Sequence, residues 1–152
     1  MVASWNLAGG LAALVALLQS APLTAAGLQN VKTGSPEGFT HRVSAYVAAL
    51  PGSPAPAASG GLMSREVRYF IGIGYRVQGA EATAETTLCA VVDAFHRAFH
   101  TTYPSRDLGG VIDNGRFEER PERSPVYQRL AVQEFRIVPL VLVGTQQETF
   151  PL

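Results

Sequence analysis

The chain has 152 residues, with 12 Lys and Arg against 12 Asp and Glu, so its formal net charge is zero. Its length predicts one domain spanning residues 1–152, able to bury roughly 68–70% of its unfolded surface. Zero net charge excludes the basic footprint of a general nucleic-acid binder. The single cysteine, Cys89, excludes an intrachain disulfide and a cysteine-based zinc site.

The first segment is rich in Ala and Leu and predicts a packed helix over residues 4–20. Ser4 is a candidate N-cap, and Pro22 is expected to end the helix. The alternative is a secretory signal, since small residues follow at 21–27. No Lys or Arg precedes Lys32, so that signal would lack a positively charged start. The apolar run is also too short to span a membrane, which takes roughly 20 residues.

Two short strands are expected next, at residues 28–33 and 41–50. The segment 51–61 consists only of Pro, Gly, Ser and Ala, so it has no large apolar residue and no charge. Such a segment buries too little to order itself, so it is expected to be a mobile loop. A loop of that length between strands is either functional or a tolerated insertion.

The strongest pattern lies at residues 65–99. Strict alternation predicts a long strand whose buried face carries Val67, Tyr69, Ile71, Ile73, Tyr75 and Val77. After Gly79 the period changes to that of an amphipathic helix. Its apolar stripe consists of Leu88, Val91, Val92, Phe95 and Phe99. A strand that runs directly into this helix requires the helix to fold back onto a sheet.

The remaining elements close that sheet. Residues 110–117 predict a strand, in which Asp113-Asn114-Gly115 forms a bulge or a tight turn. Residues 127–143 predict the closing strand, with Pro139 placing it at an edge or bending it. The polar tail, residues 144–152, is expected to be loose or docked on a neighbour.

No motif predicts a catalytic, cofactor or metal site. Gly72, Gly74 and Gly79 precede a helix, but their spacing does not fit a dinucleotide loop. Close packing of a helix on that face of the strand explains Gly72 and Gly74 better.

A metal site on the helix is also disfavoured. His96 and His100 are four residues apart, near Asp93 and Cys89, yet zinc needs a third or fourth ligand and His41 lies on a distant strand. We therefore expect no bound metal and no enzymatic activity.

A run of mixed charge follows the strand at 110–117. Its two interpretations are a solvated loop and a surface that pairs charges with an identical neighbour. The second makes these residues candidate subunit contacts: Arg116, Glu118, Glu119, Arg120, Glu122 and Arg123.

The order of these elements resembles the tail terminator, or tail-to-head joining, proteins of long-tailed phages and related tail-like particles. The resemblance rests on the N-terminal Leu-Ala helix and on four segments that follow it, namely residues 65–75, 88–99, 108–113 and 133–142. It covers residues 62–145 well and the first 50 in outline.

The resemblance implies an α+β fold, a single domain whose mixed or antiparallel sheet has the N-terminal helix and the second amphipathic helix on one face. It implies a structural virion protein, a homohexameric ring that caps the tail tube, ends its polymerisation and presents the head-docking surface. The implied partners are further copies, the tail tube protein and a head-side connector or stopper. DNA would pass through the lumen without sequence-specific contacts, and no membrane is involved.

Assembly in the host cytoplasm and a place at the tail–neck junction follow from that resemblance. The alternatives are another neck protein, such as a stopper or adaptor, and an exported monomeric binding domain.

Overall fold

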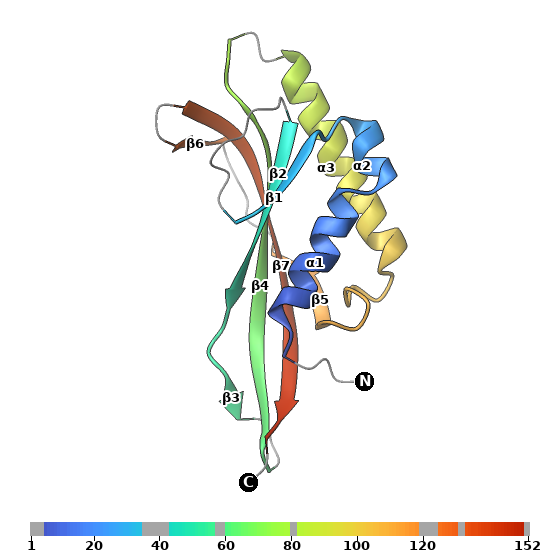
Figure 1. Cartoon of the computed structure of the whole chain (residues 1–152), viewed down its shortest axis with the longest axis vertical. Helices are drawn as coiled ribbons and strands as arrows, with labels where there is room; N and C mark the ends of the chain where they lie inside the picture. Colours follow the sequence, from blue (N-terminus) through green and yellow to red (C-terminus); the bar gives the residue numbers. More distant parts are fainter. Residues whose placement is uncertain are drawn as a thin grey trace.

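A computed structural model describes three helices and seven strands in one α+β unit (Figure 1). The residues that it describes are 5–34, 43–56, 60–79, 82–118, 125–130 and 133–150. The helices are α1 (Leu7–Leu18), α2 (Ala21–Ala26) and α3 (Ala82–Thr102). The strands are β1 (Asn30–Thr33), β2 (Val43–Pro51), β3 (Ala55–Pro56), β4 (Leu62–Arg76), β5 (Asp113–Phe117), β6 (Val126–Leu130) and β7 (Gln133–Thr149).

The strands form one mixed sheet in the order β1-β2-β4-β7-β5, with β3 beside β4 and β6 beside β7. β1 runs parallel to β2, and the other pairs are antiparallel. The three helices lie on one face of this sheet, and β4 and β7 run together well beyond the helical layer (Figure 1). The expected α+β fold, with helices on one face, is therefore confirmed.

The long strand and its helix build the core as their periods predict. On β4, Val67, Tyr69, Ile71 and Ile73 are completely buried beneath the helices. On α3, the buried stripe consists of Leu88, Val91, Ala94, Phe95 and Phe99, while Val92 is only partly buried. The helix register expected from Phe95 and Phe99 is confirmed.

The N-terminal segment forms two helices rather than one. α1 begins at Leu7, because the Asn6 side chain accepts a hydrogen bond from the Gly9 backbone N–H at 3.0 Å and so caps the helix. Ser4, the expected cap, lies outside the described residues. Pro22 does not end the helical segment; it occupies the first turn of α2, where a missing N–H costs no hydrogen bond.

Part of the segment 51–61, expected to be a loop, belongs to strands. Pro51 ends β2, and the two residues of β3 pair with Met63 and Ser64 of β4. The backbone of this loop therefore gains hydrogen bonds from the extended end of β4, which the uncharged composition does not reveal. Residues 57–59 lie outside the described residues.

The C-terminal region differs most from expectation. The stretch predicted as one strand over 127–143 contains both β6 and the start of β7. The tail predicted as loose continues β7 to Thr149, and Leu62–Val67 of β4 pairs with Gly144–Thr149. The tail is extended because β4 begins early enough to offer it a partner along its whole length.

Pro139 is tolerated because of a local gap in the sheet. β7 pairs with β6 up to Ile137 and with β5 from Leu142 onward. The Val141 carbonyl points toward β5, where it accepts from the Glu118 N–H at 2.8 Å. Because alternate residues of a strand direct their backbone groups to the same side, the nitrogen of Pro139 faces the gap between β5 and β6, where no described strand pairs with β7.

Candidate subunit-contact site

Two of the six candidate contact residues lie on the face of the sheet that carries no helix. Arg116 is on β5, and Glu118 follows its last residue. Glu119, Arg120, Glu122 and Arg123 lie outside the described residues. Of the charged run, the structure therefore describes only Arg116 to Glu118, which lie beside β4 and β7.

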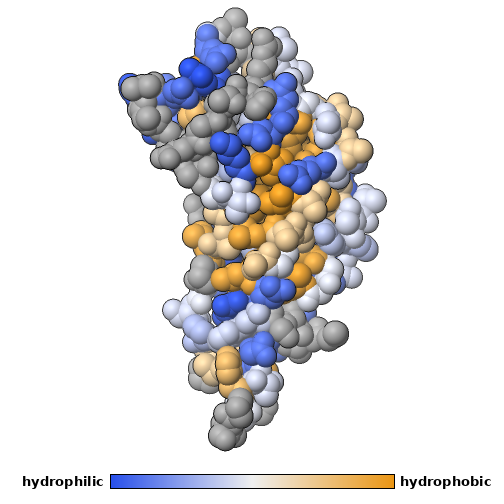
Figure 2. All heavy atoms as spheres, viewed as in Figure 1, coloured by the Kyte–Doolittle hydropathy of each residue, from blue (hydrophilic) through white to orange (hydrophobic). Residues whose placement is uncertain are grey.

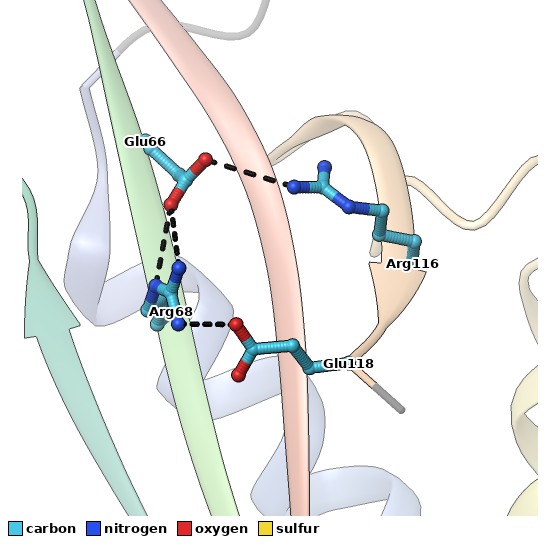
Figure 3. Close-up of polar contacts among 4 residues, drawn as sticks. All are labelled: Glu66, Arg68, Arg116 and Glu118. Carbon is cyan, nitrogen blue, oxygen red and sulfur yellow. Dashed lines mark hydrogen bonds and ion pairs between the residues drawn. The ribbon is translucent and has the colours of Figure 1, made fainter. Parts of the chain in front are cut away.

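These two residues form a charged quartet with Glu66 and Arg68 of β4 (Figure 3). Arg68 pairs with Glu66 at 3.1 Å and with Glu118, and Arg116 pairs with the other oxygen of Glu66 at 3.7 Å. The signs alternate along the quartet, so its charges neutralise one another within one subunit. The expected pairing of Arg116 and Glu118 with a neighbour would have to compete with these internal pairs.

The quartet is half exposed, with side-chain exposures from 28% for Glu118 to 57% for Arg116. Hydrogen bonds from Arg68 to Glu66 and then to Glu118 raise the pKa of the guanidinium above its ordinary value. At such exposure each pair is strongly screened by water and contributes little to folding.

Beside the quartet, the helix-free face of the sheet is apolar. Phe135 and Ile137 of β7 are buried together with Tyr46 of β2, and Phe70 packs partly against them. Farther along β2, Leu50 remains 52% exposed opposite Arg68. The large apolar side chains of this face are therefore mostly covered within the subunit, and Leu50 is the one that stays exposed on it among the described residues.

The glycines of β4, Gly72 and Gly74, make room for other parts of the sheet and not for a helix, as had been expected. A Cβ at Gly72 would lie 2.2 Å from the Tyr46 ring, so Gly72 makes room for a cross-strand aromatic ring rather than for a helix. A Cβ at Gly74 would lie 2.2 Å from the Arg136 carbonyl oxygen. Both glycines therefore allow close packing within the sheet. The packing of Tyr46 also buries its hydroxyl, and this burial raises the pKa of Tyr46.

His96 and His100 lie on the opposite side, where α3 meets β5. Their rings stack with centroids 6.4 Å apart, and the His96 ring meets Phe117 edge-on at 5.1 Å. Burial, followed by the neighbouring His100, lowers the pKa of His96. Across the described residues, no three His, Cys, Asp or Glu side chains gather as a metal site, and Cys89 is exposed. His41 lies outside the described residues.

The buried polar residue Gln146 was not predicted from the sequence. Gln146 is completely buried, and its side-chain oxygen accepts from the Asn6 N–H at 3.1 Å and from Arg65 at 2.9 Å. Its amide nitrogen donates to the carbonyls of Asn6 at 3.2 Å and Val111 at 3.1 Å. Gln146 thus ties the start of α1 to β4, β7 and the turn before β5. A usable signal was its period-two continuation of Leu140 and Leu142.

Neither a scan against protein-family models nor a search of curated proteins found a match. No helix among the described residues is long and apolar enough to cross a bilayer.

Proposed function

We propose that this protein is a structural subunit that assembles into a six-membered ring on the tail tube of a long-tailed phage or related particle. The ring ends polymerisation of the tube and offers the surface to which the head docks. Its partners are further copies of the chain, the tail tube protein and a head-side connector or stopper protein.

The order and placement of the elements support this proposal. The resemblance implies helices on one side of a sheet, and α1, α2 and α3 lie on one face here (Figure 1). Two of the segments that carry the resemblance, residues 65–75 and 133–142, lie on the paired central strands β4 and β7. The resembling segments are thus those around which the subunit is built.

The observation that carries the proposal is the helix-free face of the sheet. Leu50 is 52% exposed on this face, and Ala48, Phe70 and Pro139 are only partly buried. A two-sided sheet with apolar residues on both faces normally has a second layer over each. In the proposed ring, an identical subunit covers the part of this face that remains exposed around Leu50, and the charged quartet beside it sets the register of the contact.

Sedimentation velocity and negative-stain imaging of the purified protein, alone and with tail tubes, test the proposal. We expect closed rings of six times the 16.2 kDa subunit mass, seated on tube ends. A protein that remains monomeric at high concentration and leaves tube ends bare contradicts it. Rings that bind the head vertex but not the tube end favour a stopper or adaptor instead.

A further inference from the structure

Strand β5 contains the Asn-Gly dipeptide of the chain, Asn114-Gly115. The hydrophobic area that Figure 2 shows over α1 consists of Leu, Ala, Gly and Val and offers no reactive side chain. Asparagine is chemically labile, and a following glycine increases this lability. The reason is that no side chain hinders the glycine nitrogen when it attacks the amide of the asparagine. Asn114 thus has the chemistry for a covalent change that needs no enzyme.

The dipeptide lies outside the regular ladder of the sheet. β5 is the last strand in the order β1-β2-β4-β7-β5, so one of its edges has no neighbour among the described strands. On its paired side, Asp113 lies opposite Thr145 and Arg116 opposite Val143, so β5 has one residue more than β7 between these two pairs. Such a bulge leaves the extra residue unpaired. Asn114 is also exposed to water, which the reaction consumes.

The glycine that makes Asn114 reactive is required by the fold. A Cβ at Gly115 would overlap the carbonyl oxygen of Arg106, in the turn before β5. Asn114 itself has a φ of 55°, in the left-handed region that non-glycine residues rarely adopt. The close approach of β5 to this turn therefore keeps a labile dipeptide at the bulge.

We propose that Asn114 deamidates spontaneously in the folded protein. The Gly115 backbone nitrogen attacks the side-chain carbonyl carbon of Asn114 and loses its proton, and ammonia leaves as a five-membered succinimide ring forms. One water molecule then opens the ring. Breaking the new bond between nitrogen and Cγ gives aspartate, whereas breaking the original peptide bond gives isoaspartate, whose main chain runs through Cγ.

Both products change the charge of the chain, and isoaspartate also changes the strand. The formal net charge is zero, so each product leaves the chain with one uncompensated negative charge. Isoaspartate adds a CH2 group to the main chain, at the bulge where β5 already has an extra residue. This lengthening forces Gly115 against the Arg106 carbonyl and displaces Arg116, which pairs with Glu66 at 3.7 Å. Deamidation therefore loosens β5 and the charged quartet beside it.

Ageing of the purified protein in mildly alkaline and mildly acidic buffer tests the proposal. We expect a shift to a more acidic isoelectric band that develops faster in the alkaline buffer, because the attacking nitrogen must lose its proton. Peptide mass spectrometry should locate the replacement of an amide by a carboxyl group at Asn114. Asn6 and Asn30 are internal controls, since Leu7 and Val31 follow them and hinder the attack.

Two variants separate the charge from the change in the main chain. Asn114→Gly cannot deamidate and adopts a positive φ readily, so it should stay folded and keep its isoelectric band. Asn114→Asp carries the new charge on an unaltered main chain. Hydrogen exchange should show that aged wild type loses protection in β5, while fresh Asn114→Asp keeps it.

The outcomes do not depend on ring assembly. An acidic shift confined to Asn114 in the folded protein supports the proposal. Deamidation of Asn114 that is no faster than that of Asn30 overturns it. Reaction at Asn114 only in urea, where the protein is unfolded, also overturns it, because the folded bulge would then protect the dipeptide.

Discussion

Replacing Gly10 of α1 by alanine should destabilise the protein, although helix propensity alone predicts the reverse. Alanine is favoured over glycine inside a helix by about 1 kcal/mol. A Cβ at Gly10, however, would lie 2.1 Å from both the hydroxyl oxygen and the Cζ atom of Tyr69. Tyr69 is completely buried within the core cluster, so its ring cannot swing out into solvent to relieve the clash.

The expected size follows from the contacts of Tyr69. Its hydroxyl donates to the Leu7 carbonyl of α1 at 3.1 Å, a bond that a displaced ring would lose. Overpacking typically costs about 1–3 kcal/mol, and a lost hydrogen bond about 1 kcal/mol. After the gain in propensity, Gly10→Ala should lower the free energy of unfolding by about 1–3 kcal/mol, or the melting temperature by roughly 2–12 °C in a domain of this size.

Urea and thermal unfolding measure this effect, and a double-mutant cycle assigns it to Tyr69. Tyr69→Phe removes the hydroxyl from the clash, so it should cost less in the Gly10→Ala background than in the wild type. Ala12→Gly is the matched control, because its exposed position should lose only the propensity of about 1 kcal/mol. A Gly10→Ala protein that is more stable than wild type would refute the close packing of α1 on β4.

Three further predictions concern buried polarity and charge. Gln146→Leu should lower the free energy of unfolding, measured in urea, by about 2–4 kcal/mol, because it removes hydrogen-bond partners from Asn6, Val111 and Arg65. The control Gln147→Leu, at the half-buried neighbouring position, should change the free energy of unfolding by less than about 0.5 kcal/mol, and equal losses would count against the role of Gln146. The lowered pKa of His96 means that its contribution to stability is present above the ordinary value of 6.5 and is lost as the pH falls through the lowered folded-state pKa. Urea unfolding at about pH 7.5 and pH 5.5 should therefore show a smaller loss for His96→Gln than for the wild type; an unchanged loss contradicts it. Reversing Glu118, Glu119 and Glu122 to Lys should weaken ring assembly more at low salt, while the subunit stays folded, since exposed ion pairs contribute little to folding and are screened by salt. Asp93→Lys is the control, and a triple variant that assembles like the wild type in low-salt sedimentation places the contact elsewhere.

Local periodicity was enough to predict the centre of this fold. The alternation of Val67, Tyr69 and Ile71 depends only on the two-residue repeat of a strand, and the spacing of Phe95 and Phe99 only on the turn of a helix. Each pattern depends only on residues that are close together in the chain. Strand β4 and helix α3, with their buried faces, could therefore be predicted from the sequence.

The candidate site was predicted less completely. Arg116 and Glu118 were selected because they open a charged run, but the sequence offered no reason to pair them with Glu66 and Arg68. Those partners are about 50 residues away in the chain and become neighbours only because β4 and β7 pair and β5 joins β7 beyond them.

Tertiary structure alone decided the remaining features. Residues 144–149 are polar and contain no apolar stripe, yet they form a strand because β4 extends far enough to pair with them. Gly10 is suited to α1 only because the Tyr69 ring lies against it, and Gln146 is buried only because Asn6, Arg65 and Val111 converge on its amide. Propensity and periodicity report on a residue and its nearest neighbours in the chain, whereas these roles depend on which distant segments the sheet brings together.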